Sequence, residues 1–325
     1  MPGNKNILIA EPIVESAIEK LREIGNVTVA RRGELKSEKD LSKALINVDA
    51  FLSMLSNNVT KTVLKNAPRL KIVANHAVGI DNIDIKTAKK LGIRVSNTPD
   101  VLTDATADLA LALMLAAARK FPAAENYLRN GKFHGWEPLG FLGTEISAST
   151  VGIVGMGRIG QAFARRVKAF GAKIIYHNRN RVPEKTEALL GAVYEPDLDK
   201  MLSEVDILSL HCPMNDETHH LINRKRLALL KNDSVIINTA RGAIIDEEAL
   251  AHSLHNHQIG GAGLDVYENE PEIHPGLLNA PNCILLPHIG SATHHTRKKM
   301  GELAANSIIG VLQNKPDTDI PNLVT

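Results

Sequence analysis

Short apolar runs alternate with amphipathic stretches along most of the chain. From residue 5 to 98, β-branched runs such as NILIA, NVTVA and LKIVANHA are separated by segments with helical spacing such as VESAIEKLREIG. The same alternation restarts at Thr150 and continues to about residue 287. Alternation of this kind is typical of a parallel sheet covered by helices. The pattern therefore predicts an α/β protein with two doubly wound parallel sheets.

Three segments lie outside this alternation. Residues 103–120, TDATADLALALMLAAARK, are apolar on nearly every side, which predicts a buried helix running through a domain or subunit interface, with Thr103 as its N-cap. Residues 121–149 have no clear period, and we expect a helix followed by a loop or arm. A last helix, from about Thr293 to Leu312, follows the second sheet. We expect it to return to the first domain, giving domains 1–99 plus 289–325 and 100–288.

Composition and charge narrow the possible partners. The 325 residues suffice for two domains, and 38 Lys and Arg nearly balance 36 Asp and Glu. Because the charges nearly balance, the protein as a whole has no strong electrostatic attraction to nucleic acid or to an anionic membrane, and a small soluble partner is favoured. The two cysteines are too few for a disulfide framework, the apolar run at the N-terminus is too short for a signal peptide, and charges interrupt every later apolar segment before it reaches the length of a membrane span. These features predict a cytoplasmic protein.

The run TVGIVGMGRIGQAFA, residues 150–164, places Gly155, Gly157 and Gly160 between an apolar strand and an amphipathic helix. In this context the first glycine allows a tight turn, the second lets backbone approach a pyrophosphate, and the third lets the helix pack close to the strand. The helix N-terminus then faces the anion. The motif predicts dinucleotide binding; the alternative is a purely structural turn between strand and helix.

The next strand ends in HNRNR, residues 177–181, where NAD-specific sites carry an acid that binds the ribose hydroxyls. No Asp or Glu occurs between Gly155 and Glu184. Arg179 and Arg181 are suited to binding a 2′-phosphate, with Asn178 and Asn180 as neutral donors. The segment predicts NADP(H) as the preferred cofactor and NAD(H) as the weaker one. The alternative is that both arginines are solvated turn residues.

Three later stretches bring an arginine, an acid and a histidine to the ends of strands: NTARG, GLDVYENEP and PHIGSATHHTR. With LKIVANHAVGIDNID, NTPDVLTDATAD and GIVGMGRIG, they give the chain a close resemblance to the D-isomer-specific 2-hydroxyacid dehydrogenases, in the glyoxylate/hydroxypyruvate reductase branch. The resemblance covers nearly the whole chain. It implies a Rossmann dinucleotide-binding domain and a flavodoxin-like substrate domain, with a cleft between them that closes at hinges near residues 99 and 288.

The resemblance implies that Arg241, Glu270 and His288 are catalytic. Reduction of a 2-keto acid leaves an alkoxide that must be protonated, and His288 is the expected acid. Glu270 is expected to stabilise the protonated imidazole and orient its ring. Arg241 is expected to bind the substrate carboxylate or polarise the keto oxygen. The alternatives are a structural histidine, a helix-capping Glu270 and an Arg241 that merely belongs to a turn.

The remaining site residues are carried over by motif position. Val78 and Gly79 match a loop whose amides bind the substrate carboxylate, Leu55 and Ser56 match the opposite side of that pocket, and Asp265 matches a residue that meets the nicotinamide amide. Trp136 resembles a tryptophan that reaches a neighbouring subunit's active site; the alternative is an interface or core anchor. Further cofactor contacts are expected from Arg158, Ile159, Cys212, Pro213, Thr218, Thr239, Ala240, Arg241, His288 and Gly290.

Other functions remain open on the sequence. HSLHNH, residues 252–257, lacks the thiolates and carboxylates of a closed metal site, so no metal is predicted. A phosphoglycerate or phosphite dehydrogenase on the same scaffold is one alternative, and a dinucleotide-sensing corepressor-like binding module is another. A homodimer is expected through the helix at 103–120 and the arm after it.

Overall fold

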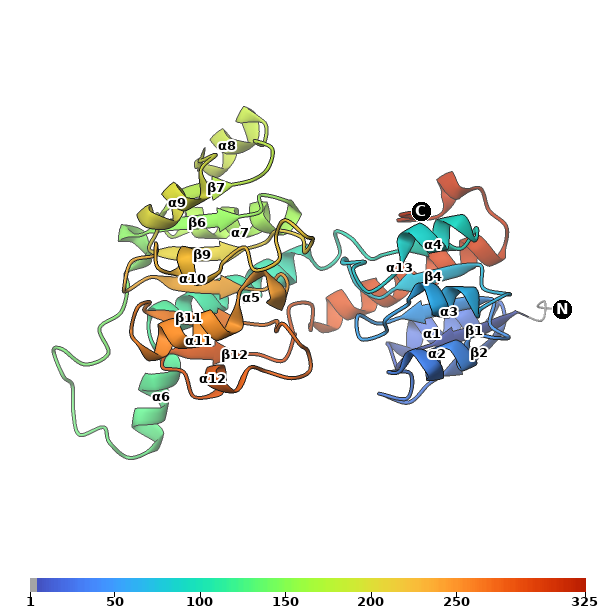
Figure 1. The fold of residues 1–325 in the computed structure, drawn as a ribbon, viewed down its shortest axis with the longest axis horizontal. Coiled ribbons are helices and arrows are strands. Elements are labelled where there is room, and N and C mark those ends of the chain that lie inside the picture. Colours follow the sequence, from blue (N-terminus) through green and yellow to red (C-terminus); the bar gives the residue numbers. More distant parts are fainter. Residues whose placement is uncertain (1–4) are drawn as a thin grey trace. The chain divides into compact units, whose positions relative to one another are not determined.

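The computed structural model describes residues 5–325, which divide into two compact units (Figure 1). The first unit ends at Leu102 and resumes with Ser291–Thr325, and the second unit is Thr103–Gly290. The boundaries thus fall a few residues later than 99 and 288. At the second crossing, the buried carboxylate of Asp265 accepts the N–H groups of Ile289 and Gly290, which ties both residues to the second unit.

The first unit contains a five-stranded parallel sheet in the order β2-β1-β3-β4-β5, the flavodoxin-like order, as predicted. Its strands are β1 (Asn6–Ile9), β2 (Asn26–Val29), β3 (Ala50–Ser53), β4 (Ile72–Asn75) and β5 (Arg94–Ser96). Its helices are α1 (Glu15–Arg22), α2 (Glu38–Ala44), α3 (Lys61–Lys65), α4 (Ile85–Lys90) and α13 (His294–Leu312), with a 3₁₀ turn at Asp317–Asp319.

Both faces of this sheet are covered because side chains alternate along each strand. Leu8 of β1 packs with the core beneath α2, α3 and α4. Ile7 and Ile9 face the other core, which α1 and α13 complete with residues such as Ile308. Helix α13 begins after Thr293, whose hydroxyl accepts the Thr296 N–H as an N-cap, so the last helix does return to the first unit.

The second unit contains a seven-stranded parallel sheet in the order β12-β11-β10-β9-β6-β7-β8. Read from β8, this is the Rossmann order with one added strand, and the order reverses between β6 and β9. Ligands of such sheets bind at the carboxyl ends of the strands near that reversal. The strands are β6 (Thr150–Val154), β7 (Lys173–His177), β8 (Ala192–Tyr194), β9 (Ile207–Leu210), β10 (Val235–Asn238), β11 (Gly261–Leu264) and β12 (Cys283–Leu285).

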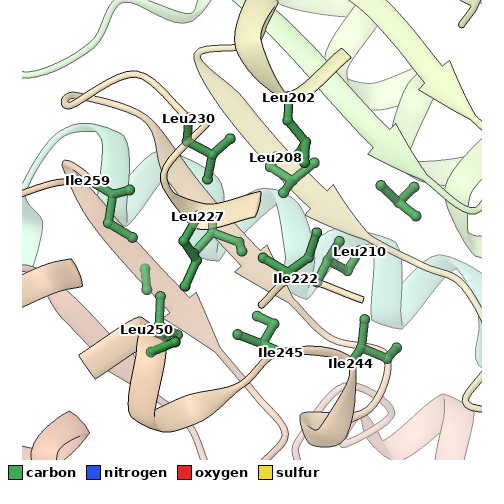
Figure 2. Packing of buried hydrophobic residues seen from close by; sticks show 14 of the residues in the cluster. Leu202, Leu208, Leu210, Ile222, Leu227, Leu230, Ile244, Ile245, Leu250 and Ile259 are labelled. Carbon is green, nitrogen blue, oxygen red and sulfur yellow. The ribbon is translucent and has the colours of Figure 1, made fainter. Parts of the chain in front are cut away.

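Helices cover both faces of this second sheet. One core lies beneath α9, α10 and α11 and includes Leu202, Leu227 and Leu250 (Figure 2). The other core lies beneath α5 and α7. The helices are α5 (Thr103–Ala118), α6 (Phe121–Arg129), α7 (Arg158–Ala169), α8 (Glu184–Leu190), α9 (Leu198–Glu204), α10 (Arg224–Leu227), α11 (Glu247–His255) and α12 (Pro275–Leu278), with 3₁₀ turns at Ile146–Ala148 and Gly242–Ile244.

The packing of helix α5 inside the second unit accounts for its unusually apolar sequence. It packs against α7 and strands β10 and β11, and it buries residues such as Ala110 and Met114. The helix begins at Thr103 itself rather than after it. The segment that follows consists of α6 and a long irregular stretch, as predicted. Among residues 5–325, no helix is both long and apolar enough to cross a membrane.

Candidate active site

The glycine-rich turn after β6 is shaped by two close approaches of the main chain. A Cβ on Gly155, whose φ is +97°, would lie 2.4 Å from the backbone N of Cys212. A Cβ on Gly160 would lie 2.0 Å from the carbonyl O of Gly155. Only glycine fits either position, so the strand, the turn and the start of α7 pack as tightly as the sequence motif implies.

Gly157 differs from these two glycines because it faces open space. A Cβ built there has no atom within 4 Å, and Gly157 is the N-cap of the 12-residue helix α7. The N–H groups of the first helical turn, which begins with Arg158 and Ile159, therefore adjoin an open region with partial positive charge. A dinucleotide pyrophosphate fits these residues.

The segment after β7 is anchored to the glycine turn by Asn178. Its side-chain oxygen accepts the Met156 N–H at 2.9 Å, and its carbonyl oxygen accepts the Tyr194 hydroxyl at 3.0 Å. Arg179 is solvent-exposed, with its side chain 80% accessible and 3.6 Å from the carboxylate of the equally exposed Glu217. Asn180 is exposed as well. Arg179 is thus available to a ligand that approaches this end of the sheet.

Arg181 is held differently from Arg179. Its Nε and Nη2 donate to the two carboxylate oxygens of Glu187 at 2.9 and 2.7 Å. The Tyr176 hydroxyl donates to the same carboxylate at 2.6 Å. The hydrogen bonds from Arg181, followed by that from Tyr176, lower the pKa of Glu187 to about 2. Arg181 thus has a structural partner that the sequence pattern did not reveal, and the binding of a phosphate by Arg179 and Arg181 stays a prediction.

The loop after β9 lies against the glycine turn. Cys212 is buried, and burial raises the pKa of its thiol to about 11, so it contributes packing and not a thiolate. The Thr218 hydroxyl donates to the Pro213 carbonyl at 2.7 Å and stabilises the turn between them. After β10, the buried Thr239 hydroxyl has no partner among residues 5–325, next to Ala240.

A cavity of about 490 Å³ opens next to Leu221, near the end of the loop that follows β9. It combines apolar walls with an ion pair, because Arg226 donates to Asp199 at 2.7 Å. No sequence motif predicted that the residues lining this cavity would come together. They belong to the end of β7 and to the segments around α9 and α10, and they are His177, Pro196, Asp197, Leu198, Asp199, Leu221 and Arg226.

Arg241 reaches its place because the chain folds back against the loop after β11. A Cβ on the next residue, Gly242, would fall 1.8 Å from the carbonyl carbon of Tyr267. The glycine of the NTARG stretch is therefore what lets the two segments touch. The main chain of Arg241 is extended, and its carbonyl oxygen accepts a hydrogen bond of 2.8 Å from the side-chain amide of Asn238. The positive charge of the Arg241 guanidinium helps to lower the pKa of Glu270.

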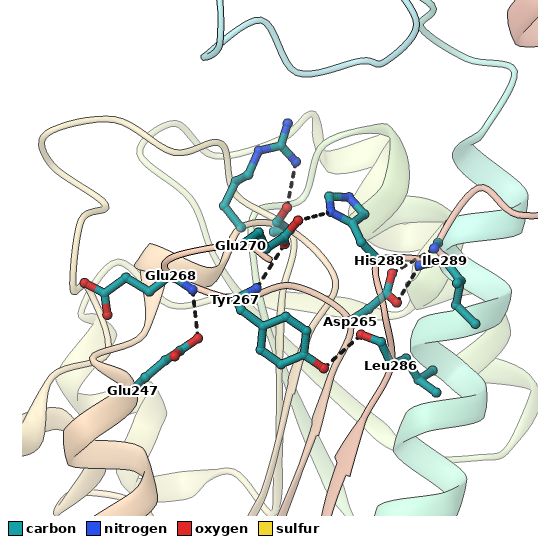
Figure 3. Close-up of polar contacts among 11 residues, drawn as sticks. Glu247, Asp265, Tyr267, Glu268, Glu270, Leu286, His288 and Ile289 are labelled. Carbon is teal, nitrogen blue, oxygen red and sulfur yellow. Dashed lines mark hydrogen bonds and ion pairs between the residues drawn. The ribbon is translucent and has the colours of Figure 1, made fainter. Parts of the chain in front are cut away.

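Glu270 and His288 form a hydrogen-bonded pair (Figure 3). Oε2 of Glu270 lies 2.8 Å from Nδ1 of His288, and Oε1 accepts the Tyr267 N–H at 3.0 Å. Burial opposes ionisation of this carboxyl, but the hydrogen bond and charge of His288, with help from Arg241, outweigh it and lower the pKa of Glu270. The carboxylate thus stays charged and fixes one ring nitrogen, leaving Nε2 for a substrate.

The main chain at His288 is bent into the left-handed region, with φ of 54°. Such a conformation costs energy in a residue other than glycine and has to be held by its surroundings. Here Asp265 holds it, since its carboxylate oxygens accept the Ile289 and Gly290 N–H groups, each at 2.7 Å (Figure 3). Burial raises the pKa of Asp265. Its main contacts are thus to backbone that positions the histidine.

In the first unit, the predicted substrate residues follow β3 and β4. Leu55 and Ser56 form the turn after β3. After β4, the Val78 carbonyl accepts the side chain of Asn97 at 2.8 Å and the Gly79 carbonyl accepts that of Asn75 at 2.7 Å. Within residues 5–325, no backbone carbonyl accepts a hydrogen bond from the N–H groups of these two residues. Trp136 lies on the irregular segment after α6, with 84% of its surface exposed.

The chain is similar to known dehydrogenases in sequence and in fold. The profile of the D-isomer specific 2-hydroxyacid dehydrogenase, NAD binding domain, matches residues 111–290. A glyoxylate reductase of Thermococcus litoralis is 45% identical over 322 residues, covering 98% of this chain and 96% of that protein. Among solved structures, the TT0316 protein of Thermus thermophilus has a TM-score of 0.91 and 39% identity, covering 98% of this chain and all of that one.

Solved relatives with a bound cofactor are among the similar structures. One of them is an NADPH-dependent glyoxylate/hydroxypyruvate reductase of Sinorhizobium meliloti in complex with NADP and malonate. It has a TM-score of 0.86 and 35% identity, with 99% of each chain covered.

Proposed function

The chain belongs to the D-isomer specific 2-hydroxyacid dehydrogenase family, and from that premise we propose that it reduces small 2-keto acids with NADPH. The substrates proposed are glyoxylate and hydroxypyruvate, with 2-ketogluconate as a further candidate, and the products are D-2-hydroxy acids. The single observation that carries this proposal is the His288–Glu270 hydrogen bond of 2.8 Å, on the same unit as the glycine turn.

The catalytic roles follow from what these side chains do to charge and protons. When bound, the dinucleotide supplies the hydride that reduces the carbonyl carbon. Protonated His288 gives the proton on Nε2 to the oxygen that becomes the hydroxyl. Glu270 orients the ring through Nδ1 and stabilises its positive charge. Arg241 binds the carboxylate or the keto oxygen of the substrate and fixes its orientation.

The preference for NADP(H) over NAD(H) rests on the segment after β7. It carries no acid, and Arg179 is exposed there on a chain anchored by Asn178. We assign the main contact with a 2′-phosphate to Arg179, because two nitrogens of Arg181 already bind Glu187. The predicted contacts of Asn180, Pro213, Thr218, Ala240 and Gly290 with the cofactor stay predictions.

The role of the first unit as the substrate-binding domain remains a proposal. Its support is the pair of N–H groups at Val78 and Gly79, whose carbonyls are tied by asparagine side chains. Amides held in this way favour an anionic group such as a carboxylate. Leu55 and Ser56 stay predicted pocket residues.

Two alternative functions remain candidates for comparison. A phosphoglycerate or phosphite dehydrogenase would use the same Arg241, Glu270 and His288, so only its substrate differs. A corepressor-like module would bind the dinucleotide without turnover. The hydrogen-bonded His288–Glu270 pair favours an enzyme, since dinucleotide sensing alone does not need a poised proton donor.

A homodimer is proposed from the surface of α6 and the segment after it. Large apolar side chains are exposed there in unusual density, which is typical of an interface. They are Phe121, Leu128, Phe133, Trp136, Leu139 and Leu142. The core-facing residues of α5 pack within the second unit, so the segment after it carries most of the proposed interface. A cytoplasmic location stays a prediction from the two free cysteines.

The test is an absorbance assay at the nicotinamide band with purified protein. The four keto acids are tested with NADPH and with NADH: hydroxypyruvate, glyoxylate, 2-ketogluconate and phosphohydroxypyruvate. Phosphite is tested with the oxidised cofactors, NADP⁺ and NAD⁺. We expect the fastest turnover with glyoxylate or hydroxypyruvate and NADPH. Turnover confined to phosphohydroxypyruvate or phosphite would replace the proposed substrate class. Dinucleotide binding without any turnover would favour the binding module.

A further inference from the structure

Three potential metal ligands meet in the second unit, and none of them belongs to the pair formed by Glu270 and His288. They are His219, His220 and Glu268, and one ligand atom from each lies within 4.8 Å of the others. Nε2 of His220 is 2.8 Å from Oε1 of Glu268, and the two imidazole rings stack with centroids 4.1 Å apart. We propose that these three residues bind a transition-metal cation of the Zn²⁺ type.

The backbone on both sides of this cluster is fixed. His219 and His220 lie in a turn where their N–H groups donate to Asn215 and Ala243 at 2.9 and 2.8 Å. His220 has a left-handed main chain, with φ of 46°, which an imidazole-bearing residue adopts only when its surroundings impose it. On the other side, the Glu268 N–H donates to the Glu247 carboxylate at 2.8 Å (Figure 3). Rigid ligands of this kind favour binding, because little order has to be gained.

Two further carboxyl groups adjoin the cluster. One is Glu247, which accepts the N–H of Glu268. Glu270 lies two residues beyond Glu268 and is a carboxylate as well. Imidazole binds a metal in its neutral form and a carboxyl group binds it as the carboxylate, so two imidazoles and one carboxylate together bring one negative charge to a divalent cation.

The ligand types select the class of cation. Two imidazoles and one carboxylate suit Zn²⁺, Ni²⁺, Co²⁺ or Cu²⁺, whereas Mg²⁺ and Ca²⁺ prefer oxygen ligands alone. Bonds of about 2.0–2.2 Å place neighbouring ligand atoms roughly 3–3.5 Å apart. The pair from His220 and Glu268 nearly meets this spacing, and a side-chain rotation of the exposed His219 on its fixed backbone would bring the third ligand to it. Any proton shared between His220 and Glu268 is released to solvent on binding.

Another group of histidines, HSLHNH at residues 252–257, is conspicuous in the sequence, but no metal is predicted there. HSLHNH lies on and just after α11, where His255 is 2.9 Å from the Gly276 carbonyl. Among residues 5–325, the only group of three such ligands is His219, His220 and Glu268. Sequence spacing does not reveal it, because Glu268 lies 48 residues beyond His220. The histidines of α11 therefore serve as a matched control.

The test titrates untagged full-length protein with Zn²⁺ by calorimetry, and with Co²⁺ by absorption spectroscopy. We expect one ion per chain. Both His219→Ala and Glu268→Gln should weaken binding by about 10-fold or more. The double variant His252→Ala/His255→Ala should bind as the wild type does. No activity is measured, so the result does not depend on the proposed reaction.

Three outcomes would overturn the proposal: no binding by the wild-type chain, undiminished binding by His219→Ala, or loss of binding in the α11 double variant. His219 is exposed, so its replacement leaves the fold intact and gives an answer even where Glu268→Gln fails to fold. Circular dichroism of each variant establishes which of them are folded.

Discussion

Two hydrogen bonds of 2.9 and 2.7 Å hold the guanidinium of Arg181 to the carboxylate of Glu187. The neighbouring arginine of the same segment, Arg179, has no such buried partner and extends to the surface. The two arginines therefore have separable effects. One supports the fold of the cofactor-binding edge, and the other is available to a phosphate.

Replacing Arg179 by Ala should raise the KM for NADPH about 10-fold while changing that for NADH little, because one charge-assisted hydrogen bond to the 2′-phosphate is lost. Its Tm should stay near that of the wild type. Arg181→Ala should lower the Tm, since the Glu187 carboxylate loses the two hydrogen bonds from the guanidinium and keeps only that from Tyr176. Steady-state kinetics with both cofactors and thermal melts measure the contrast. An equal loss for NADPH and NADH in Arg179→Ala contradicts the phosphate role.

The Glu187 interaction should make stability depend on pH in a defined direction. Its pKa is lowered from the ordinary 4.5 to about 2, so its contribution is complete above about pH 4.5 and disappears as the pH falls through 2. The difference in Tm between wild type and Glu187→Gln should be largest at neutral pH and shrink steadily below pH 4.5. Melts from pH 7 to 2.5 measure it, with the surface variant Glu145→Gln as control. A gap that widens in acid would show the opposite linkage.

The glycine turn offers a matched pair of variants. Gly157→Ala places a methyl group in open space, so the fold should survive while dinucleotide binding weakens. Gly160→Ala puts its Cβ 2.0 Å from the Gly155 carbonyl and should destabilise the protein severely. Fluorescence titration with NADPH and thermal melts separate the two effects. Unchanged NADPH affinity in Gly157→Ala would argue against a pyrophosphate at this turn.

His288→Gln should reduce kcat by about 10²- to 10⁴-fold, because the proton donor is removed. NADPH should still bind, since the glycine turn is unchanged. Stopped-flow and steady-state assays measure turnover, and fluorescence measures binding. His252→Gln, on the surface of α11, serves as the control. Retention of most of the kcat in His288→Gln would mean that another group supplies the proton.

Asp265→Asn should lower both stability and kcat. An amide offers one acceptor oxygen, so either Ile289 or Gly290 loses its partner, and a buried unpaired N–H costs about 1–3 kcal/mol. The bend at His288 then relaxes and the ring moves from its place. Denaturant melts and kcat measurements follow the two effects, with the exposed Asp199→Asn for comparison. Wild-type kcat in a destabilised Asp265→Asn would separate Asp265 from the histidine's position.

Sequence patterns predicted the parts of this molecule that depend on local periodicity and backbone geometry. The alternation of strands and helices predicted both sheets, and glycine spacing predicted the turn after β6. The sequence patterns did not predict features that depend on contacts between distant parts of the chain. Strand β8 has only three residues at the sheet edge, with Val193 exposed, so no periodic signal marks it. The pairing of Arg181 with Glu187 and the asparagines beneath Val78 and Gly79 are visible only in the folded chain.

The left-handed main chain at residue 288 suits glycine better than the histidine that occupies it. Because the bend is held through the amides of the next two residues, it does not depend on which side chain residue 288 carries. A His288→Gly variant should therefore keep the bend and leave a vacant volume the size of an imidazole ring. Free imidazole added to it should restore part of the turnover, turning a built-in acid into a diffusible reagent.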